Sequence, residues 1–393
     1  MTFSAFCVRC RKKVKKAERI IRYFDMFAGV GGFRAGLDLA GGFQCIGHCE
    51  IDKYADASYR AIHAPGKEEV YYPDARTIDP KELPDFDLLC GGFPCQAFST
   101  AGRRKGFEDA RGTLFFELAR VVKEKRPSYL FLENVPGLLS HDRGRTFGVI
   151  LSTLYDLGYH VEWTVLNSKH FGVPQSRRRL FLIGYLDPRC AGKILPVFGT
   201  DAKALVQIVH GRLGKRVYDS AGIACTQDTS RQSGLYFVDL TKGDPKITPN
   251  ARCLHTRQDG SLTNFKGQNS GVLYIKEATK KGYKEAHEGD SIDLGFAGSN
   301  TRRGRVFAGV AHTVDTANTH GIVLRGGRVR RLMPRECFRL QGFNEDQIDN
   351  ILAINSDAQA YKQAGNSVTV PVIKAIGRRI RAADAELYAQ ESR

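Results

Sequence analysis

The stretch IIRYFDMFAGVGGFRAGLDLAGG, residues 20–42, decides the fold class of this chain. Its first residues are apolar, β-branched or aromatic, a composition typical of a strand. A glycine-rich turn then leads into residues whose apolar positions follow helical spacing. A strand that enters a helix through such a turn is typical of open α/β sheets, which bind ligands at the carboxyl ends of their strands.

Strand and helix signals keep alternating as far as residue 186. We therefore expect an α/β fold with one doubly wound, Rossmann-like sheet domain over residues 20–187. The candidate strands after the first lie at 43–52, 85–95, 128–135, 159–167 and 178–186, and the candidate helices at 54–64, 112–127 and 147–158.

The sequence changes in character after Asp187. Short β-like pieces separated by Gly, Asp, Asn, Ser and Thr predict a smaller β-rich domain over residues 188–327. Helical patterns return in residues 328–393, where Pro334 and Pro371 stand at expected helix starts. The last helix should dock onto a core, because one apolar stripe runs along it through Val372, Ile376, Ile380, Ala383 and Leu387.

The formal net charge is +17, which predicts attraction to a polyanion. Nucleic acid is favoured over an anionic membrane surface, and a merely solubilising charge is the remaining alternative. No apolar run reaches transmembrane length, and no secretory leader is recognisable, so we expect no membrane partner and a cytoplasmic, nucleoid-associated protein. The ten cysteines do not form a disulfide pattern and should stay thiols.

Residues 1–19 form a basic arm that contains CVRCRKKVKKAER. Its Cys7 and Cys10 make a single C-x-x-C pair, whereas a structural zinc site needs four ligands and no second pair follows at zinc-ribbon spacing. We expect no metal here. The arm can add nonspecific affinity for a polyanion, and the sequence gives it no further role.

The glycine-rich turn indicates the kind of cofactor. Its glycines read G-x-G-G, not the G-x-G-x-x-G of a dinucleotide fingerprint, so a nucleoside cofactor such as S-adenosylmethionine is favoured over NAD. Glu50 ends the second candidate strand, where an acid can accept hydrogen bonds from ribose hydroxyls. Asp74 stands where a third loop would meet the same ligand. Either acid taken alone could be an ordinary surface residue.

Three further stretches place reactive groups at strand ends. Cys95 follows Pro94 just after a candidate strand, and a modest lowering of its pKa would give a nucleophilic thiolate, although a small buried hydrophobe is the alternative. Glu133 interrupts an apolar strand, where desolvation could raise its pKa and make it an acid. Arg177 and Arg179 alternate at the start of the last strand and should point together.

In chain order, these stretches resemble the DNA (cytosine-5) methyltransferase family. A long variable stretch before RLMPRE also fits the family. The resemblance implies an S-adenosylmethionine-dependent catalytic domain at 20–187, a target-recognition domain at 188–327 and a segment, 328–393, that returns to the catalytic domain. The matching blocks are DMFAGVGGFRAGL, Glu50, DAR at 74–76, GGFPCQAFS, ENVPGLL, QSRRRLFLIG, RLMPRECFRLQGF and QAGNSVTVPV.

The resemblance implies the following mechanism. The Cys95 thiolate adds to carbon 6 of a flipped-out cytosine, so that carbon 5 can take the methyl group. Glu133 holds or protonates ring nitrogen 3, and Arg179, supported by Arg177, binds the base carbonyl oxygen. No residue of the sequence is identified as the base that removes the carbon-5 proton.

The cofactor and DNA contacts follow from the same blocks. Glu50 would bind the ribose, and Ile51 and Asp74 the adenine. Gln96 and Ser99 would face the DNA, and SNTRRGRV at 299–306 is the best candidate for base reading, although its arginines could equally contact only phosphate. The implied cofactor contacts are Phe27, Ala28, Gly29, Gly31, Gly32, Glu50, Ile51, Asp74, Ala75, Pro94, Leu114, Asn366, Ser367 and Val368, and the implied DNA readers are Gln96, Ser99, Arg302, Arg303 and Arg305.

Double-stranded DNA is the expected partner, because the long recognition stretch favours a duplex. A tRNA cytosine-5 methyltransferase on the same scaffold is the alternative enzyme, and a catalytically inactive DNA-binding paralogue is the alternative from another class. We expect a monomeric modification enzyme of prokaryotic or phage type, with a cognate restriction endonuclease possible but not needed as a stable partner.

Overall fold

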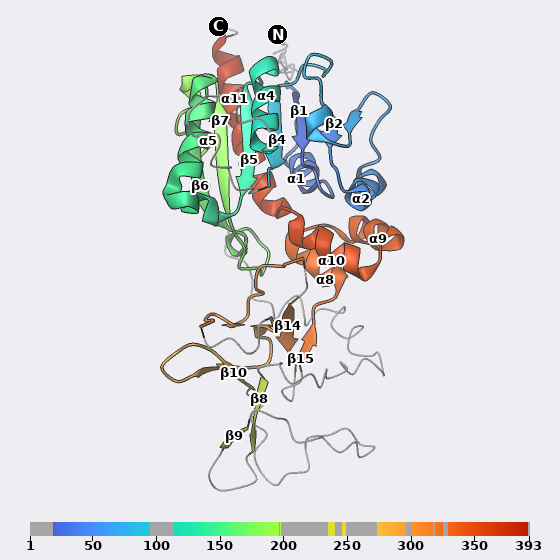
Figure 1. Cartoon of the computed structure of the whole chain (residues 1–393). Coiled ribbons are helices and arrows are strands. Elements are labelled where there is room, and N and C mark those ends of the chain that lie inside the picture. Colours follow the sequence, from blue (N-terminus) through green and yellow to red (C-terminus); the bar gives the residue numbers. More distant parts are fainter. Residues whose placement is uncertain are drawn as a thin grey trace, which may run out of the picture.

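A computed structural model describes residues 19–94, 114–195, 197, 235–239, 246–248, 273–295, 301–316, 319–324 and 329–391. Figure 1 shows an α/β unit that contains both ends of the described chain, three helices below it, and a β-rich lobe beyond these helices. The predicted α/β fold with a smaller β-rich unit is confirmed.

The α/β unit is built on one seven-stranded sheet with the order β3-β2-β1-β4-β5-β7-β6. The neighbours from β3 through β5 pair in parallel, whereas β7 runs antiparallel to both β5 and β6. The strands are β1 (Ile21–Met26), β2 (Phe43–Cys49), β3 (Val70–Tyr72), β4 (Leu88–Gly92), β5 (Tyr129–Asn134), β6 (His160–Asn167) and β7 (Arg178–Tyr185).

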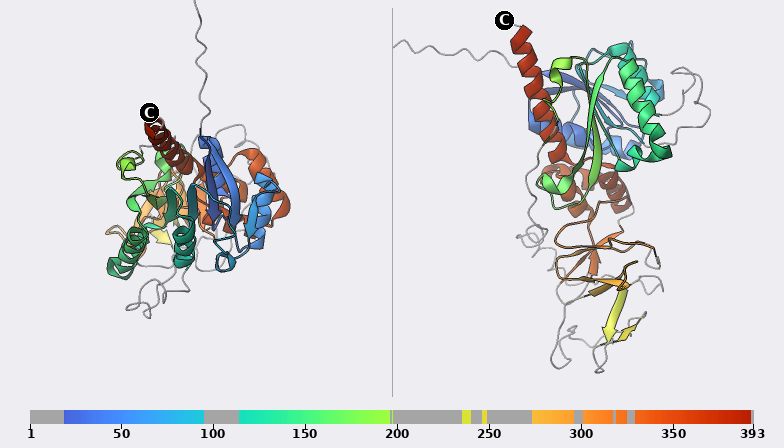
Figure 2. Two further views of the ribbon diagram at one scale, coloured as in Figure 1. Left: turned by 90° about the horizontal axis from the view of Figure 1, so that it is seen from above. Right: turned by 90° about the vertical axis from the view of Figure 1, so that its left-hand side faces the viewer.

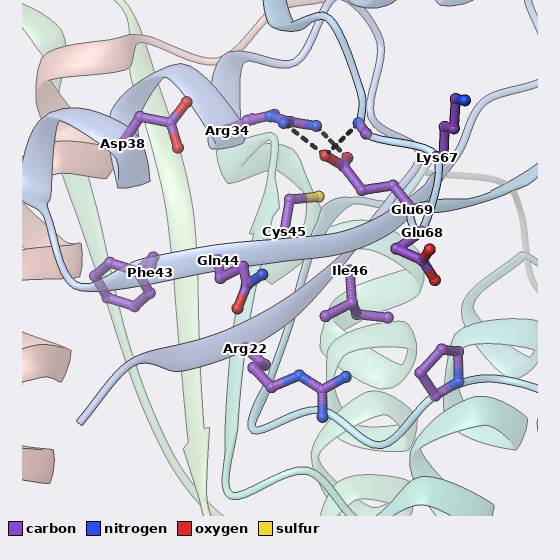
Figure 3. A pocket seen from close by; sticks show the side chains of 12 residues that line it. Arg22, Arg34, Asp38, Phe43, Gln44, Cys45, Ile46, Lys67, Glu68 and Glu69 are labelled. Carbon is purple, nitrogen blue, oxygen red and sulfur yellow. Dashed lines mark hydrogen bonds and ion pairs between the residues drawn. The ribbon is translucent and has the colours of Figure 1, made fainter.

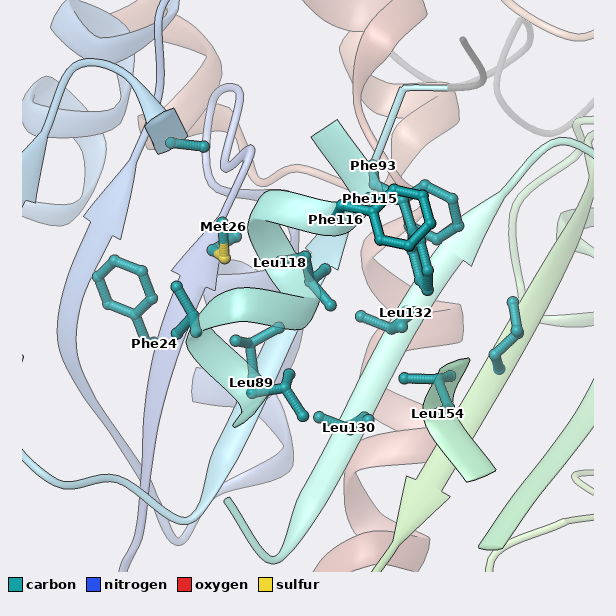
Figure 4. Close-up of a cluster of buried hydrophobic side chains, with 14 of the residues drawn as sticks. Phe24, Met26, Leu89, Phe93, Phe115, Phe116, Leu118, Leu130, Leu132 and Leu154 are labelled. Atoms are coloured by element: carbon teal, nitrogen blue, oxygen red, sulfur yellow. The ribbon is translucent and has the colours of Figure 1, made fainter. Parts of the chain in front are cut away.

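Helices cover both faces of this sheet, so the central strands are buried on both sides and read as apolar runs. On one face, α4 (Leu114–Lys125) and α5 (Arg145–Asp156) cover the cluster of Phe, Leu and Met side chains in Figure 4. On the other face, α1 (Gly32–Ala40) packs against α11 (Val370–Glu391). The right-hand view of Figure 2 shows α11 and α4 on opposite sides of the sheet.

The final helix confirms the predicted apolar stripe. All five side chains of the stripe are buried in one core with residues of α1 and of the sheet: Val372, Ile376, Ile380, Ala383 and Leu387. Burying five such side chains stabilises the docked helix by several kcal/mol, at roughly 1.5–3 kcal/mol for each large one. The chain's last described segment is therefore part of the α/β unit.

Three short helices, α8 (Pro334–Gln341), α9 (Glu345–Ile354) and α10 (Asp357–Asn366), lie between the sheet and the β-rich lobe. They share one core with Val30 and Ala35 of the α/β unit and with Val314 and Ile322 of the lobe. Helix α2 (Lys53–His63) contacts α9 from the side of the sheet. These helices thus join the two parts.

The β-rich lobe contains two four-stranded antiparallel sheets. One has the order β11-β10-β8-β9 and the other β13-β12-β14-β15. Its strands are β8 (Leu235–Asp239), β9 (Lys246–Thr248), β10 (Leu273–Lys276), β11 (Tyr283–Ala286), β12 (Ser291–Asp293), β13 (Val306–Phe307), β14 (His320–Val323) and β15 (Val329–Arg331).

Candidate functional site

The glycine turn after β1 is a tight, left-handed backbone segment. Phe27 and Gly29 have φ values of 58° and 56°, and the Gly31 amide donates to the Ala28 carbonyl at 2.8 Å. A left-handed φ is uncommon for a phenylalanine, so the surrounding fold holds this residue in a strained conformation. A Cβ at Gly31 would lie 2.3 Å from Nε2 of His63, so only glycine fits there.

Glu50 stands at the end of β2 and holds the glycine turn. Its Oε2 accepts the Gly29 amide at 2.7 Å, and its Oε1 accepts the Asp52 amide at 2.7 Å. Burial raises the pKa of this carboxyl, and the two backbone donors oppose the rise. Each oxygen keeps acceptor capacity for a hydroxyl group, as ribose binding requires.

The other predicted adenosine contacts lie at the carboxyl ends of β1, β2, β3 and β4, or begin α4. Ile51 is 68% exposed, an unusual state for isoleucine that leaves its side chain free to cover a ligand. Asp74 accepts hydrogen bonds from Arg76, which lower the pKa of its carboxyl. Ala28 and Ala75 are buried, Pro94 is exposed, and Leu114 is half-buried at the first residue of α4.

The returning segment 366–368 lies directly on the glycine turn. A Cβ at Gly32 would stand 2.8 Å from Oγ of Ser367 and 2.8 Å from Cγ2 of Val368, whereas one at Gly29 would meet nothing within 4 Å. The turn is thus closed on the side of Ser367 and open at Gly29. An open backbone turn beside the Glu50 carboxylate fits an adenosine-type cofactor such as S-adenosyl-L-methionine.

The second group of predicted residues gathers where β4, β5 and β7 meet. The parallel register pairs Gly92 with Glu133, so the loop that continues toward Cys95 leaves the sheet beside this carboxylate. Arg179 of β7 contacts it, with its Nε 2.9 Å from Oε1 of Glu133. Cys95, Gln96 and Ser99 themselves lie outside the described residues.

Asn134 is a site residue that the sequence reasoning missed. Its buried amide donates from Nδ2 to the carbonyl oxygen of Phe93 at 2.8 Å, which fixes the chain two residues before Cys95. Its position next to Glu133 at a strand end was the available signal. Without the pairing of β4 and β5, however, no partner for the amide could be named.

Arg177 departs from the expectation that it points together with Arg179. Its guanidinium donates to the carbonyl oxygens of Val314, Gly365 and Ser367, whereas Arg179 pairs with Glu133. The reason is that β7 begins only at Arg178, so the alternation of a strand does not extend to residue 177. Burial raises the pKa of Glu133, and the positive charge of Arg177, with that of Arg179, opposes the rise.

Comparison with known proteins identifies the family of this site. The family model for C-5 cytosine-specific DNA methylase matches residues 21–382. The chain belongs to this family. It is 31% identical to the orphan methyltransferase M.SPRI of Bacillus phage SPR, covering 92% of this chain and 97% of the relative. It is 33% identical to the type II methyltransferase M.HhaI of Haemophilus parahaemolyticus, covering 92% and 94%.

Solved structures confirm the fold of this methylase. The DNMT2 of Spodoptera frugiperda matches with a TM-score of 0.57 at 15% sequence identity, covering 92% of this chain and 99% of that one. Membership of the family establishes the activity: the chain is a DNA (cytosine-5-)-methyltransferase that uses S-adenosyl-L-methionine as methyl donor. A tRNA methyltransferase or an inactive paralogue is not favoured.

Among the residues predicted to read DNA, Arg305 is not supported by the structure. Its side chain is 2% exposed, and its guanidinium donates to the carbonyl oxygens of Asp293 and Lys276. It therefore ties together strands of the β-rich lobe and has no free face for DNA. Nη2 of Arg302 lies 3.4 Å from Oδ2 of Asp293. Arg303 is exposed and donates from Nε to the Ala278 carbonyl.

A cavity of about 390 Å³ lies away from this site (Figure 3). It opens at the amino ends of β1 and β2, beside Arg22 and Phe43, whereas Glu50 and Glu133 stand at carboxyl ends. Its Arg34 is held by a bidentate ion pair with Glu69. Because the cavity lies at the opposite ends of the strands from Glu50 and Glu133, we assign the methylase chemistry to the carboxyl ends and not to this cavity.

The described residues contain no group of three or more His, Cys, Asp or Glu side chains placed to bind a metal ion, and Cys7 and Cys10 lie outside them. None of the helices described is both long and apolar enough to cross a lipid bilayer.

Proposed function

We propose that this methylase modifies one cytosine within a specific duplex DNA sequence, with Cys95 as the nucleophile toward the flipped-out base. One observation carries the assignment. Strand β4, which ends three residues before Cys95, lies beside the nearly buried pair of Glu133 and Arg179, so an acid and a fixed cation stand at the strand end from which the chain continues to Cys95. These are the groups that activation of cytosine carbon 5 requires.

The chemistry begins with addition of the Cys95 thiolate to carbon 6, which moves an electron pair toward carbon 5. Glu133 protonates ring nitrogen 3, so negative charge does not accumulate on the base. Arg179 binds the base carbonyl oxygen and keeps Glu133 in place. The cofactor supplies an electrophilic sulfonium methyl group for carbon 5. Loss of the carbon-5 proton then lets the thiolate leave.

The cofactor would be held by residues from four strand ends and the returning segment. Glu50 binds the ribose hydroxyls, Ile51 and Asp74 contact the adenine, and the open backbone at Gly29 admits the rest. Supporting this assignment, the backbone turn is closed by Ser367 and Val368 on one side only. The remaining proposed contacts are Phe27, Ala28, Gly31, Gly32, Ala75, Pro94, Leu114 and Asn366.

We propose that the chain is divided into four parts. These are a basic arm at 1–19, a catalytic domain at 20–187, a target-recognition domain at 188–327 and a returning segment at 328–393. Gln96, Ser99, Arg302 and Arg303 remain proposed DNA contacts. The net charge of +17 supports binding to a polyanion. We further propose a monomer that acts in the cytoplasm at the nucleoid and that needs no stable complex with a restriction endonuclease.

The test traps the covalent step. In duplex DNA that carries 5-fluorocytosine, the fluorine at carbon 5 cannot leave as the proton does, so the Cys95 adduct persists after methyl transfer. We expect a denaturation-resistant protein–DNA complex from the native chain and none from Cys95→Ser. The control is Cys90→Ala, because Cys90 is wholly buried in the core and should leave adduct formation intact.

A second measurement concerns the substrate. Native protein with tritiated S-adenosylmethionine should label duplex DNA and not tRNA, and label found only in tRNA would overturn the DNA proposal. An adduct formed equally by Cys95→Ser would overturn the assignment of the nucleophile. Bisulfite sequencing of host DNA after expression would then give the recognised sequence.

A further inference from the structure

Arg177 joins three segments that are far apart in the sequence. Its side chain is 2% exposed, and it lies in the loop just before β7. Nη1 donates to the carbonyl of Val314 at 3.0 Å, and Nη2 donates to the carbonyls of Gly365 and Ser367 at 2.9 and 2.7 Å. Val314 belongs to the β-rich lobe, whereas Gly365 and Ser367 flank Asn366 of the proposed cofactor segment.

The loop that carries Arg177 is itself bound to the β-rich lobe. The amides of Ser176 and Ala311 donate to the carbonyls of Ala311 and Pro174, each at 2.8 Å. Gln175 is wholly buried and uses both ends of its amide. Its Oε1 accepts the Val314 amide at 3.0 Å, and its Nε2 donates to the Leu340 carbonyl at 2.8 Å. The position of residues 311–314 is thus fixed relative to this loop.

The same contact region continues to the start of α11. Gln341 is wholly buried; its Nε2 donates to the Ala364 carbonyl at 2.8 Å, and its Oε1 accepts the Thr369 hydroxyl at 3.0 Å. That hydroxyl also lies 2.8 Å from Oγ of Ser168, in the loop before Arg177. The cofactor segment 366–368 is therefore held on both of its flanks by buried polar contacts.

Burying an arginine in this way is costly, which indicates a role beyond packing. Its partners in the described residues are carbonyl oxygens, and desolvation lowers the pKa of the guanidinium to about 9. Apolar side chains commonly replace buried charges without loss of stability. What they cannot replace is a planar fork of donors that fixes several acceptors in one geometry.

We propose that Arg177 is a positioning residue, whose fork of donors binds the carbonyls of Gly365 and Ser367 and so holds the cofactor segment 366–368 against residues 311–316 of the β-rich lobe. The inference rests on the proposed cofactor role of residues 366–368. A second observation supports the close approach. A Cβ at Gly365 would lie 2.6 Å from the carbonyl carbon of Asp315 and 2.6 Å from the amide nitrogen of Thr316.

The test compares two buried arginines with similar partners. Arg177→Lys keeps the positive charge but loses the fork. Arg305→Lys is the matched control, because Arg305 is equally buried and also donates to backbone carbonyls, those of Asp293 and Lys276, which belong to the β-rich lobe. We expect Arg177→Lys to raise the dissociation constant of S-adenosylhomocysteine about tenfold by calorimetry. Arg305→Lys should change it by less than about twofold.

Amide hydrogen exchange without cofactor gives a second readout. The amides of Val314 and Ser367 donate to Gln175 and Gln363. Both should exchange faster in Arg177→Lys and stay protected in Arg305→Lys. Equal effects of the two variants on cofactor affinity, or unchanged exchange at both amides in Arg177→Lys, would overturn the proposal.

If Arg177→Lys gives no folded protein, Gly365→Ala tests the proposal in its place. Its added methyl would push α10 away from residues 315–316 without touching the guanidinium, and we expect the same tenfold weakening, so an unchanged dissociation constant would overturn the proposal. Asn366→Ala tests the underlying assignment separately. If that variant binds S-adenosylhomocysteine normally, the cofactor role of the segment is wrong, while the exchange data still report on Arg177.

Discussion

Glu133 and Arg179 form a nearly buried ion pair across neighbouring strands, with Oε1 of Glu133 2.9 Å from Nε of Arg179. Their side chains are 12% and 17% exposed. Burial raises the pKa of Glu133, while the positive charges of Arg179 and Arg177 oppose the rise. The arginine therefore both locates the carboxyl group and limits how firmly it keeps its proton.

Arg179→Met should shift the pH dependence of turnover. Without the nearest positive charge, burial raises the pKa of Glu133 further, so the protonated acid persists to higher pH. The alkaline limb of the kcat profile should therefore move to higher pH, while kcat falls by about 10²–10³-fold because a charged donor to the base is lost. Glu133→Gln is the control and should have no such limb. An alkaline limb that stays in place in Arg179→Met would show that Glu133 is not the acid.

Asp25 should make the methylase less stable as the pH rises. The carboxyl is wholly buried at the end of β1, accepts a weak hydrogen bond from Cys90, and has a pKa raised to about 8 by burial. The unfolded chain loses this proton near pH ~4, so the folded state binds more protons from there to about pH 8. The free energy of unfolding should decrease over that range and level off above it.

Urea unfolding across this range checks the prediction in Asp25→Asn. The variant should have a flatter pH dependence, differing from the native chain by up to about 1.4 kcal/mol per pH unit. Identical slopes for the two proteins would mean that Asp25 titrates normally in the folded state.

Gly32→Ala should weaken cofactor binding. The added Cβ would stand 2.8 Å from Ser367 and Val368, so the returning segment must move away from the glycine turn. We expect the KM for S-adenosylmethionine to rise at least about tenfold, equivalent to about 1.4 kcal/mol. Gly148→Ala is the matched control, because that position in α5 has nothing within 4 Å of the new Cβ. It should leave KM unchanged and stabilise the helix by about 0.5–1 kcal/mol. Equal KM values for all three proteins would contradict the contact.

Asn134→Ala should slow chemistry without affecting the cofactor. The variant loses the 2.8 Å hydrogen bond to the Phe93 carbonyl, so the chain leading to Cys95 is less well fixed. Misplacing a reacting group by about 1 Å can cost a factor of about 10² in rate. We expect kcat to fall by roughly that factor in single-turnover assays, with the dissociation constant of S-adenosylhomocysteine unchanged. A variant with normal kcat would show that the loop needs no such support.

The sequence by itself determined the α/β class, the strand ends that carry Glu50 and Glu133, and the apolar stripe of the last helix. These features are local: the glycine turn, the apolar runs and the helical spacing act within a few residues of each other. The family blocks supplied the reaction in the same way, because reactive residues stand in short, recognisable motifs.

Only the tertiary structure decided which partners the buried polar groups have. The antiparallel insertion of β7 between β5 and β6 brings Arg179 to Glu133, and the neighbouring Arg177 binds carbonyls 137 to 190 positions away along the chain. Arg305 likewise has a side chain suited to reading DNA, but its guanidinium donates to carbonyls of its own lobe. A buried donor must find an acceptor, and that acceptor is set by the packing of distant segments, which no local pattern encodes.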